Sequence, residues 1–269
     1  MTKIIHKNFK ILEKIKDELL FLSKSEIRLK ILECIKKTPF SVKEIVKLTG
    51  LSYSSVSSNV NKLEQNMNIF KIDNRYEMNP ITEIYLNNLL EFNSTLKLIN
   101  KFKEFWNLHN INEIDEKELE NITDLKNSKL IKSTPSDIYR THNTIKSFLL
   151  NSYHIRAIFP FLHPDYPKIL ENQLLKEGKV EIIVPEEIYK DLILKIDPKV
   201  RKRSLNNGKL IVHTTEKPID LYLTVCERRI TLGLFKNDGS FDQNRILISR
   251  DKKAHEWSEN LFNEIKSQI

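Results

Sequence analysis

A serine-rich run from Thr49 to Val60, TGLSYSSVSSNV, constrains the fold of this chain more than any other stretch. Five of the seven residues from 52 to 58 are serines, a composition typical of flexible linkers. Four apolar residues nevertheless recur at helical spacing, namely Val56, Val60, Leu63 and Met67. A linker would not keep this period, so the run predicts a helix whose outer face is small and polar.

Two capping patterns predict two helices before the serine-rich one. Ser23 and Glu26 are three residues apart, as are Ser41 and Glu44, and this is the spacing of a reciprocal capping box. The first of these helices should stop near Pro39, because the residue before a proline resists helical angles.

The segments that flank the serine-rich helix predict a turn and a hairpin. Gly50 can end the preceding helix in the left-handed conformation, and Ser52 can cap the next one. Residues 69–78 alternate as two short strands around a turn at Asp73-Asn74. Helix, helix, turn, helix and hairpin is the order of a winged helix-turn-helix, a DNA-binding fold.

The positive charge of the chain is concentrated at its N-terminal end. The chain has 269 residues and a net charge of +8. Residues 1–80 hold 15 of the lysines and arginines and 9 of the aspartates and glutamates, so +6 of that charge lies there. Concentrated charge suits a protein that binds the phosphate backbone of DNA, although a lysine-rich solvated surface would have the same composition.

The serine-rich helix and the hairpin supply the candidate contacts to double-stranded DNA. Small hydroxyls and amides can approach bases and phosphates closely in the major groove, and a hairpin can reach the minor groove or the backbone. The predicted DNA-binding residues are Ser52, Ser54, Ser55, Ser58, Asn61, Lys62, Lys71, Asn74 and Arg75. Serine lacks the bidentate arginine–guanine contact, so we expect specificity to depend on DNA shape.

A long helix is predicted after the hairpin. Asn79 precedes Pro80 as a helix cap, and no breaker follows between residues 81 and 106. Because this helix is longer than most in globular proteins, we expect it to connect two domains or to pack in a homodimer. A further helix is predicted over residues 116–130.

The pattern of apolar and polar residues changes near residue 132. Strand and helix patterns alternate and then give way to consecutive strands, which predicts an α/β domain with a mixed sheet. The expected domains are a winged helix-turn-helix over 1–79, a helical linker or dimerisation segment over 80–133, and an α/β sensor domain over 134–269.

Motifs for catalysis, metals and cofactors are missing from the sequence. The five glycines form neither a dinucleotide-binding motif nor a phosphate-binding loop, and the seven histidines show no HExxH motif and no ligand pair. No GxSxG nucleophile elbow occurs. We therefore expect no catalytic residue, no metal site and no cofactor.

The two cysteines and the N-terminal end favour a cytoplasmic protein. Cys34 and Cys226 lie in apolar runs without a CxxC partner, so they are expected to be buried free thiols in a reducing compartment. Residues 3–22 read as an amphipathic helix, without the continuous apolar core of a signal peptide.

The arrangement resembles a known family. SEIRLKILECI and SVKEIVKLTGLSYSSVSSNVNKLEQ look like archaeal winged-helix regulators. FWNLHNI, LKNSKLIKSTPSDIY, IRAIFPFLHPDYPKILENQLLKEGKVEIIVPEEIY and DLYLTVCERRITLGLFKNDGSFDQNRILISRDKKAHEWSENLF look like the middle domain of the methanogenesis-regulator family of methanogenic archaea. The resemblance covers about residues 25–265 and implies a transcription factor whose C-terminal domain acts in sensing and dimerisation.

The same resemblance implies a phospholipase D-type fold without its catalysis. The HxKxxxxD motif is absent, since Asn143-Thr144 follows His142 and Thr214-Thr215 follows His213. The chain also departs from regulators of this type after the recognition helix, where Asn66-Met67-Asn68 replaces a glycine. Asparagine tolerates the left-handed angles that this turn requires.

A small-molecule effector is the remaining expected partner. FPFLHPDY lies just beyond a predicted strand, where ligand crevices form in α/β folds, and Phe159, His163 and Tyr166 are candidate effector-binding residues, with ordinary loop packing as the alternative. Two other functions stay open: a hydrolase or transferase with an accessory winged helix, and a winged helix that binds protein.

Overall fold

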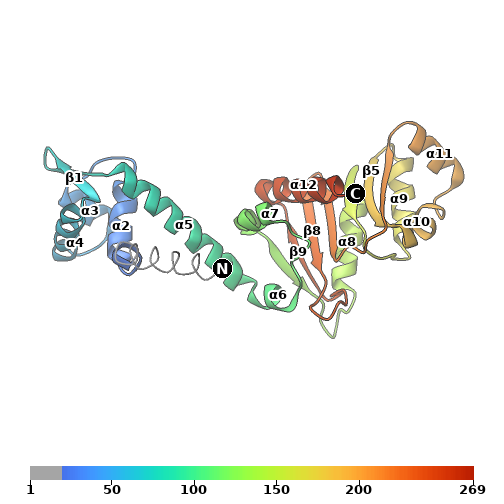
Figure 1. The fold of residues 1–269 in the computed structure, drawn as a ribbon, viewed down its shortest axis with the longest axis horizontal. Helices are drawn as coiled ribbons and strands as arrows, with labels where there is room; N and C mark the ends of the chain where they lie inside the picture. Colours follow the sequence, from blue (N-terminus) through green and yellow to red (C-terminus); the bar gives the residue numbers. More distant parts are fainter. Residues whose placement is uncertain (1–19) are drawn as a thin grey trace, which may run out of the picture. The chain divides into compact units, whose positions relative to one another are not determined.

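The computed structural model describes residues 20–269, which divide into two compact units, one ending at Asn93 and the other spanning Ser94–Ile269. The helix predicted over residues 3–22 lies almost entirely outside the described residues. Figure 1 shows the elements of both units, and α5 (Pro80–Lys101) contributes residues to each. No helix within residues 20–269 is long and apolar enough to cross a membrane.

Within the described residues, the first unit contains three short helices after residue 25, a hairpin and the start of α5, together with helical residues 20–23. The helices are α2 (Glu26–Ile35), α3 (Val42–Thr49) and α4 (Tyr53–Gln65), and the hairpin joins β1 (Ile69–Ile72) to β2 (Arg75–Met78). Their apolar faces form one core, and Val56, Val60 and Leu63 of α4 are fully buried in it. The serine-rich run is therefore a helix on a packed stripe, as predicted.

Side-chain caps explain where these helices begin. Ser41 and Glu44 form the expected capping box with both hydrogen bonds present, and Ser52 accepts a hydrogen bond from the amide of Ser55. The other predicted box is wrong: Ser25, not Ser23, caps α2. An N-cap must stand directly before the first helical residue, and Ser25 is the serine in that position.

The turns on either side of α4 differ in how they reach the left-handed conformation. Gly50 ends α3 with a φ of 70°. After α4, Met67 rather than an asparagine takes this conformation, with a φ of 55°, so the prediction that asparagine accommodates the turn was wrong. Met67 also lies beyond the end of α4 with 70% of its surface exposed, so it does not belong to the buried stripe.

The hairpin turns where expected and is fixed to the helices. Asp73 and Asn74 both have positive φ, 45° and 65°, as a two-residue turn of type I′ requires. Phe40, in the connection between α2 and α3, exchanges both backbone hydrogen bonds with Tyr76 of β2. The hairpin is thereby joined to the connection between two helices.

The second unit is built on a seven-stranded mixed sheet of order β3-β9-β8-β7-β4-β5-β6. Only β4, β5 and β6 are parallel to one another, and the other neighbours are antiparallel. The strands are β3 (Lys129–Lys132), β4 (His154–Ile158), β5 (Lys179–Pro185), β6 (Leu210–Thr215), β7 (Leu221–Cys226), β8 (Arg229–Leu234) and β9 (Arg245–Ser249). The predicted α/β domain with a mixed sheet is confirmed.

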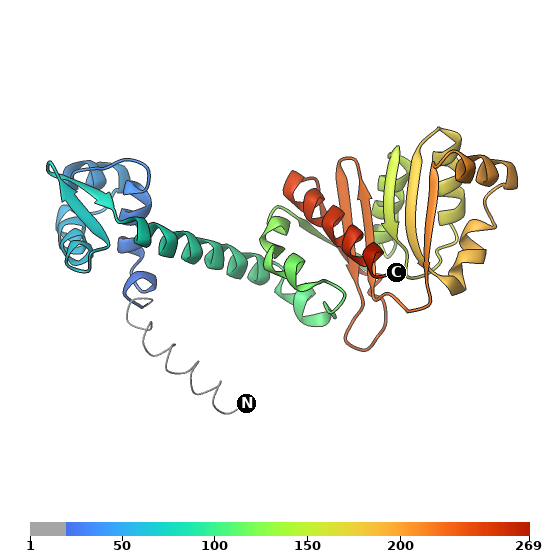
Figure 2. The same cartoon turned by 45° about the horizontal axis from the view of Figure 1, so that its top comes forward.

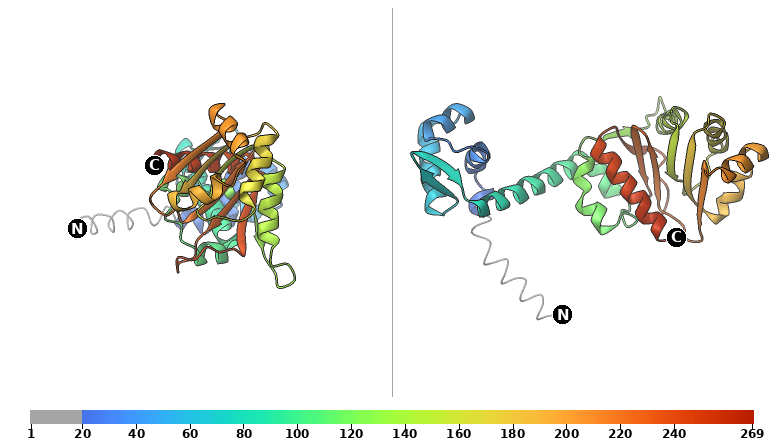
Figure 3. Two further views of the ribbon diagram at one scale, coloured as in Figure 1. Left: turned by 90° about the vertical axis from the view of Figure 1, so that its right-hand side faces the viewer. Right: turned by 90° about the horizontal axis from the view of Figure 1, so that it is seen from above.

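Helices cover both faces of this sheet. One face packs against α12 (Lys252–Ser267), α6 (Lys103–Leu108), α7 (Glu116–Glu120) and the short 3₁₀ helix Ile122–Leu125. Figure 2 shows α12, in red, crossing that face. The other face packs against α8 (Arg140–Leu150), α9 (Tyr166–Leu175), α10 (Glu186–Ile193) and α11 (Pro198–Asn206), and Figure 3 shows α8 and α9 on the side away from α12.

The long central helices were predicted with wrong ends. The helix expected over 81–106 is interrupted at Phe102, which separates α5 from α6. The helix expected over 116–130 ends at Glu120 and is followed by the 3₁₀ helix and β3. The two cysteines are free as predicted, Cys226 buried and Cys34 only half-buried.

Candidate functional site

The outer face of α4 forms a shallow polar depression. It has a volume of about 500 Å³ and is lined by Tyr53, Ser54, Ser57, Ser58, Asn61, Lys62 and Gln65. These residues share one face because they recur three or four positions apart along a helix whose opposite side is buried. Four of the predicted DNA-binding residues come together here, namely Ser54, Ser58, Asn61 and Lys62.

Three residues outside the predicted DNA-binding set also lie on this face. Tyr53, Ser57 and Gln65 line the same depression, and Tyr53 is 58% exposed. The spacing of Gln65 from Asn61 and Ser58 was available in the sequence and indicates the same side of the helix. Lys62 has no acidic partner within residues 20–269, so its charge is available to an anionic ligand.

The serines at the start of α4 are already engaged in hydrogen bonds. Ser52 caps the helix, and its hydroxyl also donates to the hydroxyl of Ser55 at 2.8 Å. Ser55 is half-buried and does not line the depression. The hydroxyls of these two residues therefore stabilise the start of the helix.

The predicted hairpin residues lie apart from the depression. Lys71 and Asn74 are exposed on the hairpin, Asn74 in its turn. Arg75 donates to the carboxylate of Glu44 at 2.8 Å and to the carbonyl of Pro39 at 3.0 Å. Because both its partners belong to the protein, Arg75 stabilises the hairpin against α3 and is less available than Lys71.

A cavity of about 480 Å³ opens in the second unit, between α8, the segment after β4 and the β8–β9 connection. Among the candidate effector residues, His163 and Tyr166 line it. Phe159 does not, because it is fully buried behind Tyr166, with the ring centroids 4.5 Å apart. The walls are mainly apolar, and Thr141, Gln243 and Asn244 supply uncharged polar groups.

Four polar side chains gather at one end of the cavity. His142 Nε2 lies 3.3 Å from the Asp165 carboxylate, and Lys146 donates to the same carboxylate at 2.7 Å. The rings of His142 and His163 stack with their centroids 3.8 Å apart. The hydrogen bond from Lys146 lowers the pKa of Asp165, while burial and then His142 lower the pKa of His163.

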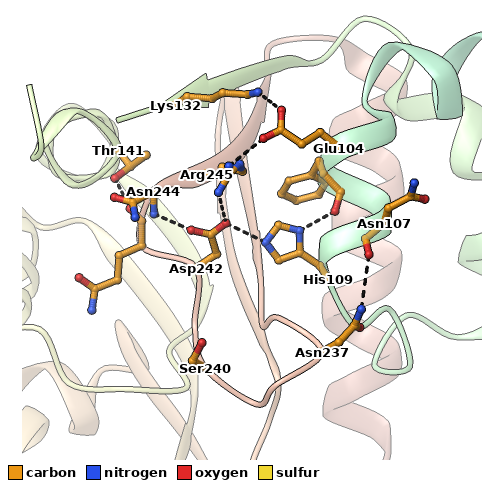
Figure 4. A network of polar contacts seen from close by, with 12 residues as sticks. Glu104, Asn107, His109, Lys132, Thr141, Asn237, Ser240, Asp242, Asn244 and Arg245 are labelled. Atoms are coloured by element: carbon orange, nitrogen blue, oxygen red, sulfur yellow. Dashed lines mark hydrogen bonds and ion pairs between the residues drawn. The ribbon is translucent and has the colours of Figure 1, made fainter. Parts of the chain in front are cut away.

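A buried polar network lies on the other side of the β8–β9 connection (Figure 4). The side chains of His109 and Asp242 are fully buried, with His109 Nε2 3.1 Å from the Asp242 carboxylate. His109 Nδ1 faces the carbonyl of Phe105 at 2.5 Å, so both ring nitrogens point at acceptors. Arg245 bridges Asp242 and Glu104. The network joins α6 to the β8–β9 connection, and the opposite side of this connection lines the cavity.

Comparisons with known proteins identify the class. Residues 138–268 match the family described as "Methanogenesis regulatory protein FilR1, middle domain". The matched residues make up most of the second unit. A curated relative, the methanogenesis regulatory protein FilR1 of Methanothrix harundinacea (strain 6Ac), is 24% identical over 241 residues, 88% of this chain. The chain spans about half, 54%, of the length of that relative.

Solved structures give weaker similarities. The archaeal chromatin protein TrmBL2, described with a mode of DNA binding, is 13% identical and aligns over 94% of this chain and 98% of its own, with a TM-score of 0.41. Polyphosphate kinase from Porphyromonas gingivalis is also 13% identical, aligns over 58% of this chain and 28% of its own, and has a TM-score of 0.35.

Proposed function

We propose that this chain is a DNA-binding transcriptional regulator whose first unit is a winged helix-turn-helix. The observation that carries the proposal is the outer face of α4. It presents hydroxyls, the amides of Asn61 and Gln65, and Lys62, which has no ion pair among the described residues, on a helix whose other side is fully buried. In this assignment α4 enters the major groove, which is wide enough to admit a helix, and the β1–β2 hairpin is the wing.

The side chains of this face suit close contact with DNA. Ser54 and Ser58 are short, so the helix backbone can come near the base edges and phosphates. Asn61 can pair bidentately with adenine, and Lys62 can neutralise a phosphate. The concentration of positive charge in residues 1–80 also favours binding to DNA by this part of the chain.

Homodimerisation through α5 forms the second part of the proposal. Six apolar side chains of α5 are 40–61% exposed, namely Ile84 and five that form one stripe, Ile81, Tyr85, Phe92, Leu96 and Ile99. Their separations of three, four and seven residues are those of a coiled-coil seam. A second copy of α5 is the occupant that matches this stripe, because an isologous pair presents the same residues to each other and places two α4 helices on a pseudo-palindromic site.

We assign the second unit to ligand sensing, with the cavity at α8 as its site. An apolar pocket of several hundred Å³ with a few convergent polar groups is the usual form of a small-molecule site. The phospholipase D-type relation of this unit belongs to the same proposal, without catalysis, since neither His142 nor His213 begins the required motif.

Fluorescence anisotropy with labelled duplexes from upstream of the chain's own gene tests DNA binding. Affinity should fall as salt rises, and Lys62→Ala should weaken binding and reduce the salt slope by about one. Lys252→Ala removes the same charge from an exposed position on α12 and serves as the matched control. An affinity that is indifferent to salt, or equal losses in both variants, would refute the proposal.

A further inference from the structure

His142, His163 and Asp165 come from two segments that the fold brings together at the cavity. His142 lies in the first turn of α8, and His163 and Asp165 belong to the segment between β4 and α9. Each of the three side chains is half-buried, and their potential metal-binding atoms all lie within 4.8 Å of one another. Neither the proposed DNA binding nor the proposed dimer gives these residues a function.

We propose that these three side chains bind a divalent transition-metal ion of the zinc type. Two imidazoles and one carboxylate are a donor set that zinc accepts, and bond lengths of about 2.0–2.2 Å place tetrahedral ligands roughly 3.4 Å apart. Side-chain movements of about 1 Å close the present spacing to that value. Both histidines line the cavity, so the fourth position is open to water or to a donor atom of a bound molecule.

Two of the contacts that the ion would displace are long, whereas the ion pair of Lys146 with Asp165 is short, at 2.7 Å. His142 Nε2 is 3.3 Å from the Asp165 carboxylate, and the amide of Asp165 donates to His163 Nδ1 at 3.2 Å. Both lie at the long end of the hydrogen-bond range, so little is lost when metal–ligand bonds replace them. Lys146 and His142 both contact Oδ2 of Asp165, and among the described residues no hydrogen bond reaches Oδ1.

Lys146 distinguishes a metal site from an anion site. Its ammonium and the Asp165 carboxylate cancel in charge, so with neutral imidazoles the cluster has no excess positive charge to attract an anion. Lys146 is 41% exposed and can move away from Asp165 when a divalent cation takes its place. An ammonium near the ion opposes binding, so removing it should strengthen the site.

The test uses the full chain, stripped of metal and titrated with Zn²⁺ and with Co²⁺. One ion per chain should bind at micromolar concentration, and Co²⁺ should develop visible absorption typical of tetrahedral nitrogen and oxygen ligands. His163→Ala and Asp165→Asn should weaken binding at least tenfold, and Lys146→Met should strengthen it severalfold. His154→Ala, which removes an exposed histidine of β4, is the control and should bind as the wild type does.

Several results would overturn the assignment. They are the absence of any bound ion, equal binding by His163→Ala and the wild type with both folded by circular dichroism, and an equal loss in the control. Titration with inorganic phosphate provides the remaining test. Phosphate binding that requires Lys146, together with weaker metal binding by Lys146→Met, would assign the cluster to an anion instead.

Discussion

The fully buried contact between Asp242 and His109 gives a stability prediction that can be worked from its geometry. The Asp242 carboxylate accepts from His109 at 3.1 Å, from Arg245 at 3.0 Å and from the amide of Asn244 at 2.9 Å. Asp242→Asn keeps the shape of the side chain but leaves His109 without its anionic partner. Removing one partner of a buried pair costs about 3–5 kcal/mol.

The lower end of this range applies, because Arg245 is 25% exposed and keeps its second partner, Glu104. We therefore expect Asp242→Asn to lower the free energy of unfolding of the second unit by about 3 kcal/mol. For a unit of this size, this corresponds to a fall in Tm of about 6–12 °C. Combining it with His109→Phe should be less damaging than the sum of the single changes, because the second change removes the unpaired group.

Intrinsic fluorescence follows this unit selectively. The chain has two tryptophans, Trp106 and Trp257, and both belong to the second unit. Asp191→Asn is the control, since Asp191 is exposed and its pairing with Lys195 is 4.0 Å long, so Tm should change little. A fall of less than about 2 °C for Asp242→Asn, or additive effects in the double variant, would refute the reasoning.

Three further predictions concern pH, backbone strain and association. Burial first, and then the Asp115 carboxyl, raise the pKa of Glu118 to about 7. The contribution of Glu118 to the free energy of unfolding is therefore full below about pH 4.5 and is lost as pH rises through 7. In Glu118→Gln, the free energy of unfolding from denaturant titrations should vary less with pH across this range. Met67→Gly should stabilise the first unit by roughly 0.5–1 kcal/mol in denaturant titrations followed by circular dichroism, because glycine adopts its positive φ without strain. Phe92→Glu should shift the chain to monomers in sedimentation velocity, whereas Asn93→Glu, beside the stripe, should not; a monomeric wild type would refute the α5 dimer.

The elements that the sequence predicted well are those with local signals. The capping box at Ser41, the left-handed Gly50 and the apolar stripe of α4 each depend on neighbours within one or two helical turns. The turn at Asp73-Asn74 belongs to the same class, because its residues favour positive φ by themselves.

The missed elements have weaker signals. Helix α8 starts after Tyr139 without a side-chain cap, and its apolar stripe of Ile145, Phe148 and Leu149 begins only in its second turn. β3 has four residues and is defined by pairing with β9, more than a hundred positions away in the sequence. Long-range pairing of this kind leaves no periodic mark on a short segment.

The candidate sites also differ in whether their residues are close together or far apart in the sequence. The α4 face could be predicted because its members share one helix. The cluster of His142, His163 and Asp165 could not, because it requires α8 to pack beside α9, and α8 itself was missed. The His109–Asp242 contact joins residues 133 positions apart, and no local pattern relates them.

The anchoring of the β8–β9 connection restricts which substitutions relatives of this chain can accept over evolutionary time. A change of Asp242 alone leaves a buried donor unpaired, so positions 109 and 242 should change together or not at all. Backbone hydrogen bonds from Asn110 to Phe235 and from Asn237 to Leu108 also fix the start of the connection. Insertions are therefore expected at its tip, where Gly239 turns the chain with a φ of 82° and an added Cβ would meet no atom within 4 Å.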